Sequence, residues 1–318
     1  MDFRTPVSLP PAPFTIDIHT HTLSAGSCFA QHMTAHLADA LPDGHVAELP
    51  NGTLYNPLSV AHALECIIDG RSDGRAFLAS EGLWRHWGYS TKTYAPSRSA
   101  LIQQVAEAEA ACREQLLRTD VLLLTLSTDS IYELADGPWA GSVVANCHKQ
   151  PAASFRELTA GIDECFDAWN ELLHNLFALR PELHVVLTLS PYRYAKCGMH
   201  ANALTKARLL LLIDRLCGAF PQRVTYFPAF EIITDELRDY RFYAPDMLHP
   251  SQQAADYVWE RFRAWTFTPR LQTYAQERAR LLGMMRHRPI LTEGREWERF
   301  EQRKHQQLLK VQALEAQD

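Results

Sequence analysis

A serine and an Asp-x-x-His pair are the residues of this sequence whose types and positions best suit chemistry. Ser27 follows Gly26 in the run Ala-Gly-Ser-Cys at 25–28, and a helical pattern begins directly after it. Glycine permits a sharp turn, and free N–H groups at the start of a helix stabilise an oxyanion. The pattern therefore predicts a nucleophile at Ser27. The alternative is that Ser27 only caps the helix, because serine is favoured at that position.

The Asp-x-x-His pair consists of Asp246 and His249, just before a helix that begins near Ser251. A serine nucleophile needs a base that removes its proton and a carboxylate that orients the base. One loop supplies both when Asp lies three residues before His. The alternative is a chance match, because a chain with 14 histidines contains such pairs by composition alone.

A second cluster of polar residues, Asp17, His19 and His21, predicts different chemistry. On a strand, residues at alternate positions face the same way, so all three would be available to ligate one metal ion. A metal-dependent hydrolase also needs ligands after later strands, and the sequence offers His148 but none after the run at 184–189. Zinc or manganese that co-purifies with the protein would support this alternative.

Short apolar runs that alternate with helical patterns predict the elements that must position these residues. The strands are expected at 14–19, 121–126, 184–189 and 224–227, with a weaker fifth at 142–145, and the helices at about 98–118, 154–179, 203–219 and 251–265. This alternation is typical of a parallel sheet with helices on both faces, and the two most apolar runs, 121–126 and 184–189, suit its middle. Because ligands bind at the carboxyl ends of such strands, Ser27 and His249 are expected to meet there.

The composition is that of an ordinary folded protein. Of the 318 residues, 47% are hydrophobic and 21% are charged, and a formal net charge of -6 leaves no basic field that would hold nucleic acid. The seven cysteines include no CxxC pair, so neither a disulfide framework nor a zinc knuckle is indicated. The longest apolar runs are too short to span a membrane, and no secretory signal is apparent. We expect a cytoplasmic protein that needs no cofactor.

The composition changes near the C-terminus. From about residue 270 the chain is rich in Arg, Glu, Gln and Leu, and its pattern is that of partly exposed helices. We expect one sheet domain at 1–265 and a helical extension at 266–318. The extension is expected to be a hairpin broken near Pro289, and it is a candidate surface for a homodimer.

Four motifs of the sequence resemble those of the GSCFA family, which is placed among the SGNH, or GDSL-like, hydrolases. They are GSCFA at 26–30, NCHKQP at 146–151, SPYRY at 190–194 and DELRDYRFYAPDMLHPS at 235–251. The resemblance implies a three-layer α/β/α sandwich with a mostly parallel sheet in flavodoxin-like order. It also implies a hydrolase site in which Ser27 is the nucleophile and Asp246 and His249 are the acid–base pair.

The sequence departs from the superfamily pattern in two motifs. The usual Gly-Asp-Ser of the first motif is replaced by Ala-Gly-Ser-Cys at 25–28, and the Gly-x-Asn-Asp of the third motif falls on Ser-Thr-Asp-Ser at 127–130. An oxyanion donor is therefore missing from its expected position. Asn146 and Asn56 are the substitutes we predict, although asparagine is equally common in turns and at helix starts.

His148, Arg193 and Arg241 are the candidate substrate contacts, since guanidinium groups bind carboxylates in a forked geometry. The alternative for the arginines is pairing with nearby carboxylates that hold the loop. Cys28 is a further candidate nucleophile, although it is expected to point to the other side of the helix.

These features predict a serine esterase, or an O-acyl hydrolase or acyltransferase, that acts on a small ester or an acylated carbohydrate. The alternatives are a metal-dependent hydrolase built on the Asp17 cluster and a catalytically inactive scaffold that binds a ligand or partner.

Overall fold

The structure is a computed structural model, and it describes residues 4–70, 73–288, 290 and 293–316. Its centre is a five-stranded sheet in which all neighbouring strands are parallel. In the order in which they lie side by side, the strands are β11 (Val224–Tyr226), β10 (His184–Leu189), β6 (Val121–Leu126), β1 (Thr22–Gly26) and β2 (Val46–Glu48). The chain thus adds strands on one side of β1 after β2 has paired on the other, which is the flavodoxin-like order that we expected.

The strands β6 and β10 lie inside the sheet, as their continuous hydrophobicity predicts. Successive side chains of β6 point to opposite faces: Leu122 and Leu124 pack in one apolar core, and Val121 and Leu123 pack in the other. Both faces must therefore be apolar, and no alternation of polar and apolar residues is possible in this strand.

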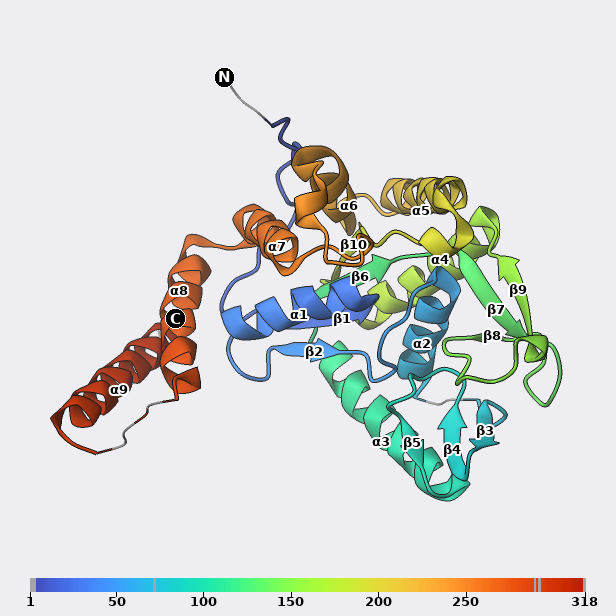
Figure 1. Ribbon diagram of the computed structural model, residues 1–318, viewed down its shortest axis with the longest axis horizontal. Coiled ribbons are helices and arrows are strands. Elements are labelled where there is room, and N and C mark those ends of the chain that lie inside the picture. The colour runs from blue at the N-terminus through green and yellow to red at the C-terminus, as the bar shows by residue number, and fades with distance from the viewer. Residues whose placement is uncertain (1–3, 71–72, 289, 291–292, 317–318) are drawn as a thin grey trace.

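Helices cover both faces of the sheet, which makes three layers (Figure 1). One layer consists of α2 (Pro57–Asp69), α3 (Arg98–Leu116), α4 (Ile162–Leu179) and α5 (Met199–Ala219). The opposite layer consists of α1 (Cys28–Ala40), the short α6 (Ala229–Glu231), α7 (Gln252–Thr266) and α8 (Pro269–Arg286). The expected α/β/α sandwich is confirmed.

The first strand lies later in the chain than we predicted. Residues 14–19 contribute only a single bridge between Ile16 and Phe267, and Asp17 then closes a turn by accepting the N–H of His19 at 2.8 Å. The strand itself, Thr22–Gly26, reads Thr-Leu-Ser-Ala-Gly and is buried along its whole length. Its small and polar residues do not form an apolar run, whereas residues 14–19 are more hydrophobic. A prediction from hydrophobicity therefore places the strand too early in the chain.

The described chain also forms two small antiparallel sheets, of three strands each, outside the central sheet. The first is ordered β8 (Val143–Val144), β7 (Ser130–Leu134) and β9 (Phe155–Thr159), and the second is ordered β3 (Phe77–Ser80), β4 (Leu83–His86) and β5 (Tyr94–Ala95). The weak strand expected at 142–145 therefore exists as β8 but lies outside the central sheet. The helix expected from 154 begins only at Ile162, because the preceding residues pair with β7.

The C-terminal helices α8 and α9 (Arg295–Glu315) form a hairpin, as expected (Figure 1). Helix α8 places Leu271, Tyr274 and Leu281 in the core that α1 also enters. Helix α9 adds Val311 to that core, and its Gln307 donates to Glu277 of α8 at 2.8 Å. Pro289 lies outside the described residues. No helix in the described ranges is both long and apolar enough to cross a membrane.

Candidate active site

A pocket of about 920 Å³ opens at the carboxyl ends of three central strands. It is lined by Ser27 after β1, by Ser127 after β6 and by Ser190 after β10. Strands β1 and β6 are the neighbours at which the strand order reverses, and ligands bind outside this point in open parallel sheets. The volume is typical of a pocket for a small organic molecule.

Ser27 lies at the turn between β1 and α1. Ser27 occupies the N-cap position of α1, but its buried side chain makes no capping hydrogen bond to the first turn of the helix. Its Oγ has no hydrogen-bond partner among the described residues. A buried hydroxyl without a partner is unusual in a folded protein and calls for an explanation, which its place beside the pocket suggests.

The glycine before Ser27 makes this turn possible. Gly26 has a φ of +133°, and a Cβ at this position would lie 2.2 Å from the carbonyl oxygen of Thr125 in the neighbouring strand. Any other residue would therefore clash with β6 as well as adopt strained backbone. The turn at Gly26 and the helix after Ser27 are confirmed, whereas the strand that leads into them is Thr22–Gly26 and not the predicted 14–19.

Asp246 and His249 form a hydrogen-bonded pair in the loop before α7. Oδ2 of Asp246 lies 2.5 Å from Nδ1 of His249, and Oδ1 accepts the backbone N–H groups of Leu248 and His249 at 2.9 and 3.0 Å. These bonds, that of the imidazole first, lower the pKa of Asp246 to about 2. Because the carboxylate only accepts, the pair places a proton on Nδ1 and leaves Nε2 free to take up another.

The pocket brings Ser27 and His249 to the same cavity although they are far apart in the sequence. The ring of Tyr192, which also lines the pocket, lies against the His249 ring with 4.3 Å between centroids. No hydrogen bond joins Ser27 Oγ to His249 within the part of the chain that the structure describes. The Ser27 hydroxyl and Nε2 of His249 are therefore not joined in this structure, while Nδ1 of His249 is held by Asp246.

Asn56 and Asn146, the two predicted oxyanion donors, both line this pocket. Oδ1 of Asn56 caps helix α2 by accepting the N–H of Ser59 at 2.8 Å, and Oδ1 of Asn146 accepts the N–H of His148 at 2.8 Å. Each residue is thus a cap or turn residue and a pocket residue at once. Because the oxygen of each amide is engaged, the amide NH2 group remains as a donor.

His148, Arg193 and Arg241 are not among the side chains that line the pocket, so our expectation for them requires correction. His148 is buried, and its Nε2 bonds to the carbonyl oxygen of His86 at 2.9 Å. Arg193 contributes its backbone N–H, which donates to Leu248 and so holds the His249 loop. Arg241 pairs with Asp239 at 2.8 Å, as the alternative of local ion pairing predicts.

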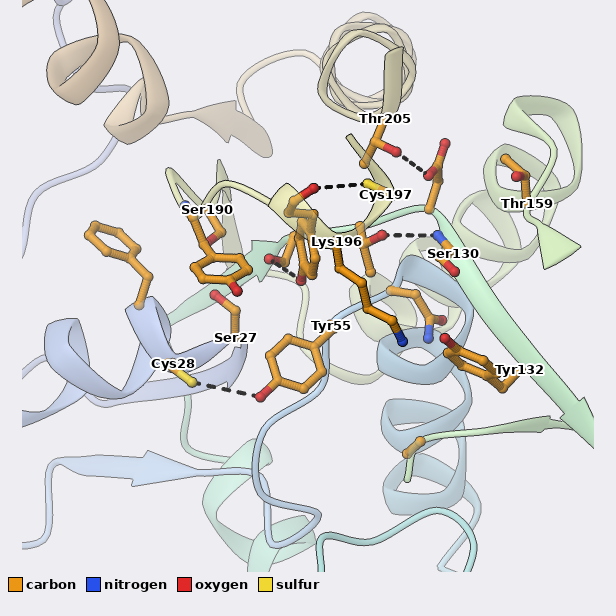
Figure 2. Close-up of a pocket in the computed structure, with 18 of the residues that line it drawn as sticks. Ser27, Cys28, Tyr55, Ser130, Tyr132, Thr159, Ser190, Lys196, Cys197 and Thr205 are labelled. Carbon is orange, nitrogen blue, oxygen red and sulfur yellow. Dashed lines mark hydrogen bonds between the residues drawn. The ribbon is translucent and has the colours of Figure 1, made fainter. Parts of the chain in front are cut away.

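Several tyrosines line the pocket that sequence reasoning did not select. Tyr55 lies at the Ser27 end and Tyr132 at the opposite end, and Lys196 extends toward the space between them (Figure 2). Cys28 was expected to point to the other side of the helix, and this expectation is wrong. It lines the pocket, and its Sγ lies 3.7 Å from the phenol oxygen of Tyr55. In the sequence, only the position of Tyr55 directly before Asn56 could have indicated that it lies at the site. The folded loop shows that it lines the pocket.

The cluster of Asp17, His19 and His21 lies at the opposite, amino end of the sheet. It is a turn before β1 and not a strand, so the side chains do not share a face as the metal hypothesis requires. His21 stacks on His45 with the rings 4.1 Å apart. Nowhere in the described ranges are three His, Cys, Asp or Glu side chains placed to hold one metal ion.

The fold and pocket define a three-layer α/β/α protein with a cavity at the switch point of its sheet. The sequence matches the GSCFA family over residues 21–262, and the chain belongs to that family. The match includes both Ser27 and the loop of Asp246 and His249.

Among the curated proteins, none matches this chain. Solved structures with a partial likeness include a family 3 carbohydrate esterase from Talaromyces cellulolyticus, with 8% identity, 81% of this chain and 99% of that chain covered and a TM-score of 0.35. A family 3 carbohydrate esterase from Clostridium thermocellum has 11% identity and a TM-score of 0.35, with 82% of this chain and 100% of that chain covered. An acetyl xylan esterase from Butyrivibrio proteoclasticus has 10% identity, coverages of 78% and 64% and a TM-score of 0.33.

Proposed function

We propose that the protein is a serine esterase in which Ser27, His249 and Asp246 act together on a small ester or an acylated carbohydrate. The observation that carries the proposal is the shared pocket. It holds an unpaired, buried serine hydroxyl and an imidazole whose other nitrogen is bonded to a carboxylate. These are the parts that nucleophilic acyl transfer needs.

In the proposed reaction, Oγ of Ser27 attacks the ester carbonyl while Nε2 of His249 takes the hydroxyl proton. The imidazolium gives that proton to the leaving alcohol as the ester bond breaks, which leaves an acyl group on Ser27. Water, or a hydroxyl of a second substrate, then attacks the acyl-enzyme while His249 takes its proton. As the bond between the acyl group and Oγ of Ser27 breaks, the imidazolium returns the proton to Oγ, and the acid or the new ester leaves. Asp246 keeps the imidazole oriented and stabilises its positive charge through both steps.

The oxyanion is proposed to bind between the amide of Asn56 and the first turn of α1. The capping bond to Ser59 fixes the amide of Asn56 at the pocket wall. The first backbone N–H groups of a helix lack the usual intrahelical partners. Among those after Ser27, the N–H of Ala30 donates to the carbonyl oxygen of Ser27 at 2.8 Å, so the proposed donors are the N–H groups of Cys28 and Phe29. Such donors stabilise charge most where water is excluded, and Asn56 is buried.

The walls of the pocket suit an alcohol that carries both hydroxyl groups and apolar faces. Tyrosine rings at both ends offer flat surfaces to a sugar ring. Glu157 and Ser130, which are themselves linked by a hydrogen bond of 3.3 Å, offer polar contacts at the end away from Ser27. We therefore expect esters of a polyol to be better substrates than esters of a simple alcohol.

Labelling with a fluorophosphonate probe tests this proposal, because the probe reacts only with an activated serine. We expect the wild-type protein and the Ser130→Ala variant to be labelled and Ser27→Ala to remain unlabelled. Ser130 is the matched control, since it lines the same pocket away from the proposed nucleophile. Hydrolysis of short-chain p-nitrophenyl esters should follow the same pattern. On acetylated sugars Ser27→Ala should be inactive and Ser130→Ala should lose part of the activity, because Ser130 is a proposed contact of the polyol.

Other results would select the alternatives. A wild-type protein that is neither labelled nor active on any ester would indicate an inactive scaffold. Ester hydrolysis that persists in Ser27→Ala and disappears with a chelator would indicate a metal-dependent hydrolase.

A further inference from the structure

A buried lysine connects the loop after β6 with the loop after β10, and both loops line the pocket. Lys206 of helix α5 is 3% exposed, and its Nζ donates to the carbonyl oxygens of Ser127 and Ser190 at 2.7 and 2.8 Å. Ser127 follows β6 and Ser190 follows β10, and both line the pocket. One ammonium group therefore bridges the carboxyl ends of two neighbouring strands.

The same bridge reaches the loop that carries Asn56. The N–H groups of Ser127 and Thr128 both donate to the carbonyl oxygen of Tyr55, at 2.9 and 3.0 Å. One residue earlier, the N–H of Leu54 donates to the carbonyl oxygen of Gly26, directly before Ser27. The loop after β2, which carries Asn56, is thus held by Gly26 on one side and by Ser127 on the other. The position of Ser127 depends in turn on Lys206.

The remaining polar groups of Ser127 are also engaged. Its Oγ bonds to the phenol of Tyr194 at 2.8 Å, and the Tyr194 ring lies 5.3 Å from the Lys206 ammonium. The N–H of Ser127 is therefore taken by Tyr55 and its hydroxyl is paired with Tyr194, although Ser127 lies where the third superfamily motif would provide an oxyanion donor. Its role in this chain is to hold neighbouring loops.

Burying the charged amine of a lysine costs free energy unless hydrogen bonds compensate for the lost water, so the groups that Lys206 contacts matter here. Burial lowers the pKa of Lys206 to about 7, and Asp129 acts in the opposite direction. Asp129 is itself engaged by Thr205 at 2.7 Å and by Arg208 at 2.5 Å. The two carbonyl oxygens are thus the direct acceptors of Lys206, and an apolar residue would leave both of them without this donor.

We propose that Lys206 is a positioning residue for the site, which holds the loops after β2, β6 and β10 in register with Ser27. The part that concerns catalysis rests on the proposed esterase function, whereas the effect on the loops does not. If Lys206 positions Asn56 through Ser127 and Tyr55, its loss affects the step in which oxyanion charge develops more than it affects substrate binding.

Hydrogen exchange tests the effect on the loops in the intact protein. We expect Lys206→Met to speed exchange of the amides at 126–130 and 188–194 relative to the wild type. Arg215→Gln is the matched control on the same helix, because Arg215 pairs with Asp163 on the surface, and it should leave these amides unchanged. Unchanged exchange in Lys206→Met would overturn the proposal, whether or not the protein is an esterase.

Kinetics on the ester with the highest activity tests the effect on catalysis. We expect kcat of Lys206→Met to fall about tenfold to 100-fold with little change in KM, at a temperature where circular dichroism shows the variant to be folded. Lys206→Gln, which keeps an N–H donor on a shorter side chain, should lose less, and it is the variant to measure if the Met variant does not fold. A kcat like that of the wild type, or a loss confined to KM, would overturn the proposal. A wild-type protein without esterase activity would count against the proposed function, and the exchange experiment would still decide the role of Lys206.

Discussion

The two ends of the central sheet carry similar residues and use them differently. At the amino end, the carboxylate of Asp17 accepts the N–H of His19 and the hydroxyl of Thr20, and so closes a turn. At the carboxyl end, the carboxylate of Asp246 holds a histidine ring that lines a pocket. The residue types are alike, although the histidine follows the aspartate by two residues at the amino end and by three at the carboxyl end. Position relative to the sheet also separates the two, because only the second pair lies beside the pocket.

The direction of the strands explains this difference. At the carboxyl end of β1 the chain turns into helix α1, whose first N–H groups point toward the pocket end of the sheet. At the amino end of β1 the neighbouring groups are histidine rings that stack face to face, His21 on His45. Stacked rings do not direct their nitrogen lone pairs at a common point, as ligands of one metal ion must.

Breaking the pair at the carboxyl end should have the largest effect. We expect His249→Ala to lower kcat/KM for ester hydrolysis by about 10⁴-fold or more, and Asp246→Asn by about 10²- to 10⁴-fold. Because hydrogen bonds keep the pKa of Asp246 at about 2, its carboxylate is charged throughout the neutral range, and its titration should not contribute to the pH profile of the wild type there.

Asp239→Asn is the matched control for that experiment. Asp239 lies in the same segment and pairs with Arg241 on the surface, outside the pocket lining. Its variant should keep wild-type kinetics. If Asp239→Asn lost as much activity as Asp246→Asn, the loss would reflect the stability of the segment and not the orientation of His249.

The two candidate oxyanion donors sharpen the comparison within the pocket. We expect Asn56→Ala to lower kcat by about 10²-fold, because a donor to the developing oxyanion is lost, and Asn146→Ala to have a much smaller effect. The capping bond of Asn56 is lost too, so its free energy of unfolding should fall by about 1 kcal/mol. Steady-state kinetics and thermal unfolding separate the two effects, and equal kinetics for the variants would remove Asn56 from the oxyanion site.

The parts of the fold that the sequence predicts are those with strong local signals. The strands β6 and β10 are continuous apolar runs, and the turn at Gly26 and the Asp-x-x-His spacing are visible in the sequence. Strand β1 was misplaced because Thr-Leu-Ser-Ala-Gly is buried without being apolar. Its small residues fit because neighbouring strands and helices cover them, and that is a property of the tertiary structure.

The supporting groups of the site could not be predicted in the same way. Tyr55 acts through its carbonyl oxygen, a group that every residue has, and Lys206 acts on two carbonyl oxygens that come from different loops. No residue type or spacing marks such bonds in a sequence. Lys206 lies in the helical pattern at 203–219, and a lysine in such a pattern normally faces solvent.

Changes at the amino end of the sheet should have the smallest effect. If the cluster is only a turn, His19→Ala and His21→Ala should keep kcat/KM within about twofold of the wild type, because neither side chain lines the pocket. His21→Ala removes the ring that stacks on His45, and a loss of about 1 kcal/mol in the free energy of unfolding is expected from that contact. Steady-state kinetics with added zinc or manganese, together with denaturant unfolding, measures both quantities. A large loss of activity in both variants, or activation of the wild type by either metal, would mean that the amino end takes part in the reaction and that the contrast between the two ends is wrong.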